Sequence, residues 1–163
     1  MSVSLSTSDL YDEHGEALES CDLPLVNYGG VREFTGAIVT FRSREDNLIL
    51  KDMIAEPGEG RVIVVDTEGV TRCAMLGDMM ALTAHRNGWA GLVINGAIRD
   101  VDALAAIPIG IKALGSNPRR SRKDGAGERN VAVTFGGALF TPGATLVSDA
   151  DGIVIGPAGI LGA

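Results

Sequence analysis

The sequence GDMMALTAHRNGWAGLVIN, residues 77–95, joins a helix to a buried strand. Apolar residues that include Met79 and Leu82 recur with a period near 3.6, which predicts a helix beginning at Gly77, and Asn87-Gly88 is a typical stop signal. Residues 91–95 (GLVIN) are short and aliphatic, as in a strand that is covered on both faces. This stretch therefore predicts an α/β fold.

The flanking sequence repeats the alternation. A strand of consecutive aliphatic residues, 61–66, lies upstream, and a short helix at 100–106 and a strand at 109–114 lie downstream. A β-α-β-α-β order requires some parallel pairing. The last third differs, because short strands there are separated by Gly, Pro and Asp turns; they are expected at 131–133, 138–140, 145–147 and 152–155. We predict a mixed α/β layer with a β-rich half, either a sandwich or an incomplete barrel.

Length and composition set the class of protein. The chain has 163 residues, 45% hydrophobic and 21% charged, which suits one globular domain over residues 1–163. No apolar run approaches the roughly 20 residues that cross a bilayer, and residues 1–5 lack the features of a signal peptide. We therefore expect a cytoplasmic protein without a membrane span. The two cysteines do not form a disulfide framework or a zinc motif.

The charge balance argues against nucleic acid as a partner. The formal net charge is −7, the wrong sign for neutralising phosphates, although an acidic surface can attract basic partner segments. Residues 117–130 (NPRRSRKDGAGERN) form an exception with five basic side chains. A solvated surface loop is the favoured interpretation, and a phosphate or RNA contact is the weaker one.

Several common sites are absent from the sequence. Gly58-Glu59-Gly60 precedes a strand, whereas a dinucleotide or methyl-donor loop follows a strand and opens a helix. His14 and His85 lack metal-ligand partners at helical spacing, and no Gly-x-Ser-x-Gly motif accompanies them.

The informative residues lie at two positions where a strand ends and a helix begins, Gly77–Met80 and Arg99–Asp100. Twenty residues separate Asp78 from Arg99, one helix plus one strand, so the two turns are expected at the same edge of the sheet. Backbone N–H groups at the helix start suit a carboxylate, and Arg99 can clamp the same anion. Asp100 can bind a hard divalent cation, and Asp78 can orient a water or move a proton. This set fits an α-keto acid.

A plainer interpretation of the same residues stays open. Asp78 can simply cap its helix, while Arg99 and Asp100 form a surface ion pair with Asp102 beside them. The spacing alone does not decide between the two.

These motifs resemble the regulator of ribonuclease activity A family, which includes class II 4-hydroxy-4-methyl-2-oxoglutarate aldolases. The resemblance covers most of the chain: VVDTEG (64–69), the stretch from Gly77 to Leu104, IGIKALGSNP (109–118) and residues 133–157. The aldolase signature of this family is an Asp, twenty residues, then Arg-Asp, and Asp78, Arg99 and Asp100 satisfy it.

The resemblance implies a role for each site residue. The backbone of Gly77, Asp78, Met79 and Met80 is expected to bind the pyruvyl carboxylate, and Arg99 to stabilise substrate and enolate. Asp100 is expected to hold the divalent metal, Mg²⁺ or Mn²⁺, and Asp78 a water for proton transfer. The implied fold is a single-domain α/β/β sandwich of the swivelling β/β/α type with mixed sheets, assembled as a ring-shaped homotrimer with the pocket between subunits.

Two functions follow from the resemblance. The first is a metal-dependent carbon–carbon lyase that cleaves 4-hydroxy-4-methyl-2-oxoglutarate-type 2-oxoacids to pyruvate and also decarboxylates oxaloacetate. The alternative is a regulator without catalysis that binds and inhibits a ribonuclease of the RNase E type or its helicase partner. A methyltransferase activity has also been attached to the family, but the sequence lacks a cofactor loop that would support it. Recognition of a distal carboxylate is left unassigned.

Overall fold

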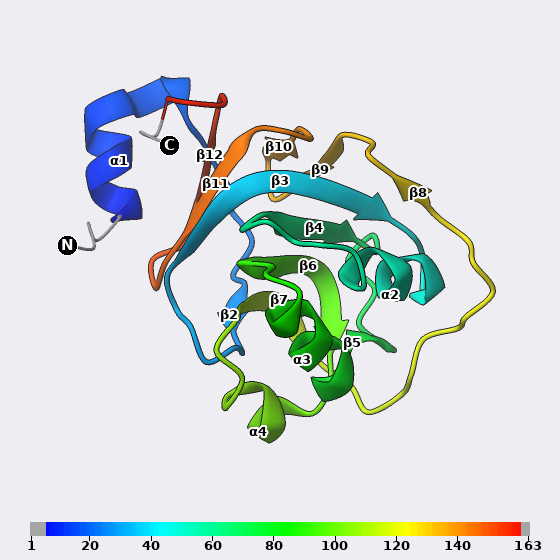
Figure 1. The fold of residues 1–163 in the computed structure, drawn as a ribbon. Helices are drawn as coiled ribbons and strands as arrows, with labels where there is room; N and C mark the ends of the chain where they lie inside the picture. The colour runs from blue at the N-terminus through cyan, green and yellow to red at the C-terminus, as the bar shows by residue number, and fades with distance from the viewer. Residues whose placement is uncertain (1–5, 161–163) are drawn as a thin grey trace.

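The computed structural model describes residues 6–160, which build one large mixed sheet, a hairpin and a few short helices (Figure 1). The ten-stranded sheet has the order β1-β12-β11-β3-β4-β6-β7-β2, with β5 paired to β6 and β8 paired to β3, and β9 and β10 form the hairpin. The helices are α1 (Thr7–His14), the 3-10 turn η1 (Gly15–Ala17), α2 (Leu48–Ile54), α3 (Asp78–Arg86) and α4 (Val101–Leu104). The strands are β1 (Glu19–Ser20), β2 (Val26–Asn27), β3 (Phe34–Arg42), β4 (Val62–Asp66), β5 (Ala74–Leu76), β6 (Gly91–Ile98), β7 (Gly110–Ser116), β8 (Glu128–Arg129), β9 (Val133–Phe135), β10 (Ala138–Phe140), β11 (Thr145–Ser148) and β12 (Ile153–Gly156).

The centre of the sheet is parallel and covered on both faces. Strands β3, β4, β6 and β7 pair in parallel, and every residue of β4 and β6 is buried. Side chains alternate along β4: Ile63 and Val65 pack with the helices, while Val62 and Val64 face the opposite layer. The continuous aliphatic runs in the sequence therefore reflect two-sided burial.

Strand β3 connects the two β layers. Its first residues, 34–37, pair antiparallel with β11, and residues 38–42 pair in parallel with β4. Strands β11, β12, β9 and β10 consequently close over the face that the helices leave open, and the second core cluster lies between these layers. Helices α2, α3 and α4 lie on the other side (Figure 1). The expected mixed α/β/β arrangement is confirmed.

Helix α3 lies where the sequence predicts it, but the side chain of Met79, one of its apolar residues, points away from the core. Ala81 and Ala84 are buried under the sheet, whereas Met79 is 71% exposed. At about 100° per residue, Met79 lies roughly 200° around the helix from Ala81, so both cannot face the core. The side chain of Met79 instead borders the site described below.

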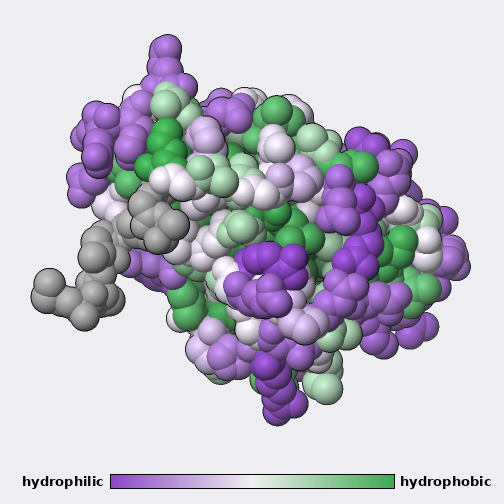
Figure 2. Space-filling view, turned by 45° about the horizontal axis from the view of Figure 1, so that its top comes forward, coloured by the Kyte–Doolittle hydropathy of each residue, from purple (hydrophilic) through white to green (hydrophobic). Residues whose placement is uncertain are grey.

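The face of the molecule in Figure 2 is mostly polar. Figure 2 shows one face, on which hydrophilic residues dominate the edges and hydrophobic residues form smaller patches between them. Within residues 6–160, no helix is long and apolar enough to cross a membrane.

The segment after β7 is held against the body of the protein. It runs from residue 117 to β8 around the outside of the fold (Figure 1). Ser121 Oγ donates to Ala74 O at 2.6 Å, and the Asp46 carboxylate accepts the backbone N–H groups of Asp124 (2.8 Å) and Gly125 (3.1 Å). Burial raises the pKa of Asp46, but these N–H groups and that of Leu48 hold it below its ordinary value. Apart from the buried Ser121 and the half-buried Asn117, residues 117–130 are exposed, so the expected surface loop is observed, and the bonds to Ala74 and Asp46 hold it against the body of the protein.

Phe34 explains two glycines in the central strands. Its ring lies over Gly91 and Gly110, and a Cβ at Gly110 would lie 2.1 Å from the ring. We expect Gly110→Ala to lower the free energy of unfolding by about 1 to 3 kcal/mol, because the ring must move within a packed core. Gly115→Ala in the same strand is the control, since a Cβ there meets nothing within 4 Å. Urea denaturation measures both, and equal stabilities would contradict this account.

Removal of the Asp46 carboxylate should release the clamped segment. Asp46→Ala is expected to speed amide exchange at Asp124 and Gly125 and to cost about 1 to 3 kcal/mol of stability. Because the folded pKa is lowered, this contribution is present above about pH 4 and is lost as the pH falls through the folded pKa. Asp124→Asn, which keeps the donating N–H group, should leave exchange slow. When the free energy of unfolding is measured at decreasing pH, Asp46→Ala should lack the decrease that protonation of this carboxylate causes in the wild type.

Candidate functional site

The two turns singled out in the sequence lie side by side. Strands β5 and β6 are parallel neighbours, with Leu76 in register with Ile98. The Arg99 N–H group donates to Leu76 O at 2.9 Å, so the chain leaves both strands at the same edge. Helix α3 begins directly after Gly77, and helix α4 after Asp100.

A cavity of about 210 Å³ opens at this edge. The six residues expected at the site all line it: Gly77, Asp78, Met79, Met80, Arg99 and Asp100. Five further lining residues were not predicted for this site: Asn47, Lys51, Ala74, Arg120 and Lys123.

The carboxylates of the site lie at the N-terminus of helix α3. Asp100 Oδ2 accepts the Asp78 N–H group at 3.0 Å, and Asp78 Oδ1 accepts the Met79 N–H group at 2.8 Å. Two of the backbone donors expected to bind a substrate carboxylate are thus occupied by carboxylates of the protein itself. The N-terminus of this helix does attract such groups, as the helix dipole and free N–H groups require.

The backbone around these contacts is specialised. Asp100 has φ 63° and ψ 47°, the left-handed region that is unfavourable for most side chains. A Cβ at Gly77 would lie 2.8 Å from Asp100 Oδ2, so a glycine permits the carboxylate to approach the helix. Left-handed residues that carry a side chain are concentrated at functional sites.

The plainer interpretation is met in part, because Arg99 Nε lies 4.0 Å from Asp100 Oδ2 as an ion pair. Asp78 is not the cap residue: the cap position is Gly77, and Asp78 Oδ1 accepts only the N–H group of the adjacent Met79. All three side chains nevertheless share one cavity. The side chain of Asp102 is outside that cavity and exposed.

Positive charge exceeds negative charge in this cavity. The cations are Lys51, Arg99, Arg120 and Lys123, against the carboxylates of Asp78 and Asp100. Lys123 Nζ donates to Asn47 Oδ1 at 2.9 Å. Partial burial and the charges of Lys51, Arg99 and Arg120 lower the pKa of Lys123. The surplus favours an anion with more than one charge.

The donor set suits a hard cation with few protein ligands. Within residues 6–160, no three His, Cys, Asp or Glu side chains form a cluster that could hold a metal. The carboxylates of the cavity are those of Asp78 and Asp100, and the Asp100 side chain is 38% exposed. Mg²⁺ is often bound by one or two carboxylates while waters and substrate oxygens complete its coordination. The two carboxylates fit such an ion, and the assignment of Asp100 as its ligand stays a prediction.

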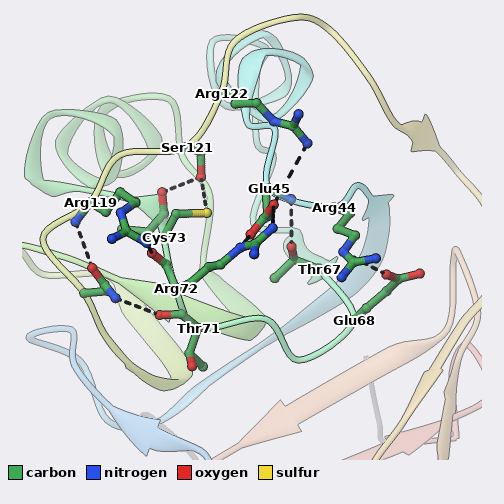
Figure 3. A network of polar contacts seen from close by, with 12 residues as sticks. Arg44, Glu45, Thr67, Glu68, Thr71, Arg72, Cys73, Arg119, Ser121 and Arg122 are labelled. Carbon is green, nitrogen blue, oxygen red and sulfur yellow. Dashed lines mark hydrogen bonds and ion pairs between the residues drawn. The ribbon is translucent and has the colours of Figure 1, made fainter.

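A second cavity, of about 280 Å³, adjoins the first. Arg120 lines both, and the second is otherwise lined by Glu45, Arg72, Cys73, Arg119 and Arg122. Figure 3 shows the carboxylate of Glu45 between the guanidinium groups of Arg72 and Arg122. The hydrogen bonds from Arg72 hold the pKa of Glu45 below its ordinary value. Glu45 is thus an anion within an arginine cluster.

The sequence carried a partial signal for the lining residues that were not predicted. Asn47 and Lys51 are four residues apart at the start of helix α2, the spacing that places side chains on one helix face. Arg120 and Lys123 belong to the basic segment, and only its clamping against β5 brings them to the cavity. That contact joins residues far apart in the sequence, so local patterns could not show it.

A larger cavity elsewhere lacks comparable chemistry. It measures about 480 Å³ and lies near β10, β11 and β12, where Glu19 is the charged lining residue and most others are apolar or glycine. His85 is exposed on helix α3 and does not line any of the cavities described here. The chemically useful groups are gathered at the first cavity.

Comparison with known proteins agrees with the fold. A structure from Geobacillus kaustophilus HTA426, described as an S-adenosylmethionine:2-dimethylmenaquinone methyltransferase, is 41% identical with a TM-score of 0.95, covering 98% of this chain and 99% of that one. The RNA-processing inhibitor RraA from Thermus thermophilus is 37% identical with a TM-score of 0.92, covering 96% and 94%. RraAS2 from Streptomyces coelicolor, described as an unusual member of the RNase ES inhibitor RraA protein family, is 26% identical with a TM-score of 0.78, covering 96% and 82%.

The family described as RraA-like, Aldolase/RraA, matches residues 7–155. That match spans nearly the whole chain and both halves of the site. The resemblance found in the sequence motifs is therefore confirmed, and the chain belongs to the RraA-like family.

Proposed function

We propose that this protein is a divalent-metal-dependent lyase that cleaves 4-hydroxy-4-methyl-2-oxoglutarate-type 2-oxoacids to pyruvate and decarboxylates oxaloacetate. One observation carries the proposal: Asp78, Arg99 and Asp100 meet at one cavity beside the N-terminus of helix α3. A cap and a surface ion pair do not require a shared cavity, whereas a small oxoacid does.

Different groups of the site bind the substrate and stabilise the charge that carbon–carbon cleavage produces. The backbone N–H groups at the start of α3 and the guanidinium of Arg99 bind the carboxylate of the pyruvyl unit. When the bond beta to the keto group breaks, its electron pair stays on the pyruvyl unit as an enolate. Arg99 stabilises this negative charge in a site already rich in cations. In oxaloacetate the same bond cleavage releases carbon dioxide.

Asp78 is the residue to which we assign proton transfer. Its Oδ1 accepts the Met79 N–H group, and within residues 6–160 its Oδ2 has no hydrogen-bond partner. A water on this oxygen accepts the proton of the 4-hydroxyl group as the bond breaks and returns a proton to the enolate carbon. The products are pyruvate and a second oxo compound, so the proton count balances.

Asp100 is the residue that would hold the divalent ion, and the ion would polarise the keto oxygen of the substrate. Only Oδ2 of Asp100 accepts the Asp78 N–H group, so its other carboxylate oxygen would be the one that binds the ion.

The methyltransferase description of the Geobacillus structure is not supported by a cofactor loop in this chain. Gly58-Glu59-Gly60, the glycine-containing loop considered for a methyl donor, precedes β4, and Gly58 packs against the backbone of Gly88 and Trp89. A loop in that position does not open a helix toward a cofactor.

Removal of the Asp100 carboxylate should abolish metal-dependent turnover. We expect Asp100→Ala to reduce pyruvate release with Mg²⁺ or Mn²⁺ by at least about 100-fold, and Arg99→Lys to reduce kcat by about 100- to 1,000-fold because it lacks the bidentate fork. A coupled assay with lactate dehydrogenase, with and without chelator, measures both. Asp102→Asn is the matched control. Unchanged turnover in Asp100→Ala would refute the assignment.

A second candidate function is regulation of a ribonuclease without catalysis. The 37% identity to the Thermus protein, which is described as an RNA-processing inhibitor, favours it. The net charge of −7 suits a basic segment of such a ribonuclease or of its helicase partner. A homotrimer, as expected for the family fold, would present this acidic surface three times.

The regulatory function predicts a salt-sensitive complex. Added protein should slow RNA cleavage by a ribonuclease of the RNase E type at about 0.05 M salt and lose this effect near 0.5 M, since screening shortens the reach of surface charges. Asp100→Ala should inhibit as well as the wild type, because the cavity is not the binding surface. Full-speed cleavage at low salt in the presence of excess protein would count against regulation.

A further inference from the structure

We propose that Arg120 binds the second carboxylate of a 2-oxo-dicarboxylate substrate and selects such diacids over 2-oxo-monocarboxylates. The inference rests on the proposed function, because it takes the first cavity to be the substrate pocket. It assigns a residue to the distal carboxylate, for which the sequence motifs offer no candidate.

The position of Arg120 is fixed by its backbone. Residue 120 forms an isolated parallel bridge with Ala74, and Ala74 N–H donates to Arg119 O at 2.7 Å. The next side chain, Ser121, is buried and bonds Ala74 O. Strand β5 leads directly to Gly77, so Arg120 is anchored to the strand that also places the start of α3.

The guanidinium of Arg120 is available for a ligand. Arg72 and Arg122 face Glu45, and Arg119 Nη1 donates to Arg72 O at 3.1 Å (Figure 3). Arg120, in contrast, has no hydrogen-bond or ion-pair partner for its side chain within residues 6–160. It is the free member of the cluster, and it is the member that lines the substrate cavity.

The charge of the cavity supports a dianion. Two carboxylates oppose four cations, and the adjoining arginine cluster around Glu45 adds further positive charge beside Arg120. A 2-oxo-monocarboxylate neutralises one cation only. A second carboxylate on Arg120 gains a bidentate, charge-assisted contact at the end of the cavity where Glu45 is already paired with Arg72.

Arg120 suits this task better than the two lysines. The ammonium of Lys123 is already engaged, because it donates to Asn47 Oδ1 at 2.9 Å. Lys51 offers a point charge on a flexible stem, whereas a guanidinium fixes the plane and direction of a carboxylate. Arg120 therefore fixes the position and direction of the distal carboxylate.

The test compares two ligands of equal chain length, 2-oxoglutarate and 2-oxopentanoate, which differ in the distal carboxylate. Binding of each is measured by titration calorimetry with Mg²⁺ present for the wild type, Arg120→Gln and Arg119→Gln. Arg119 is the matched control, because it neighbours Arg120 in the same cluster but does not line the first cavity. We expect the wild type to prefer 2-oxoglutarate and Arg120→Gln to lose about 10- to 100-fold of that preference, with 2-oxopentanoate binding unchanged.

Three outcomes would overturn the proposal: no preference in the wild type, an equal loss for both ligands in Arg120→Gln, or the same loss of preference in Arg119→Gln. Arg120→Lys should recover only part of the preference, which separates charge from the bidentate fork, and thermal melting checks that all variants are folded. Failure of the proposed function looks different. In that case the wild type would bind the diacid through Arg120 without releasing pyruvate from any 2-oxoacid.

Discussion

The site depends on the parallel pairing of strands β5 and β6. The bond from the Arg99 N–H group to Leu76 O fixes the distance between the two chain exits. Without it, the start of helix α3 and the carboxylate of Asp100 would have no reason to meet, since twenty residues separate Asp78 from Arg99. The burial of β6 on both faces stabilises this pairing, so the core of the fold also holds the site together.

The sequence predicted the parallel strands and the neighbouring turns because those features are local or follow from chain topology. Aliphatic runs, helix period and a one-helix-one-strand separation are sufficient for that inference. The orientation of Met79 could not be predicted, because an apolar residue in the first turn of a helix fits the period whether it faces the core or a cavity. The roles of Asp78, Arg99 and Asp100 remain predictions, although their proximity gives those predictions a physical basis.

The contribution of the basic segment could not be inferred from composition. A run such as Arg119-Arg120 is compatible with a solvated loop, and its position depends on one buried serine and one carboxylate, Ser121 and Asp46. Both act across long sequence separations. A charged segment with a single small residue that becomes buried therefore gives little local signal, yet here it supplies two lining residues of the candidate site, Arg120 and Lys123.

The distribution of charge separates the two candidate functions in space. Half of the 14 Lys and Arg residues line the two adjoining cavities: Lys51, Arg72, Arg99, Arg119, Arg120, Arg122 and Lys123. The remainder of the chain is consequently more acidic than the net charge of −7 suggests. Beyond a Debye length of about 8 Å at physiological salt, a ligand responds to the charges nearest to it. A small dianion would therefore be drawn to the cavities and a basic protein segment to the rest of the surface, so that the two proposed functions would not compete for the same residues.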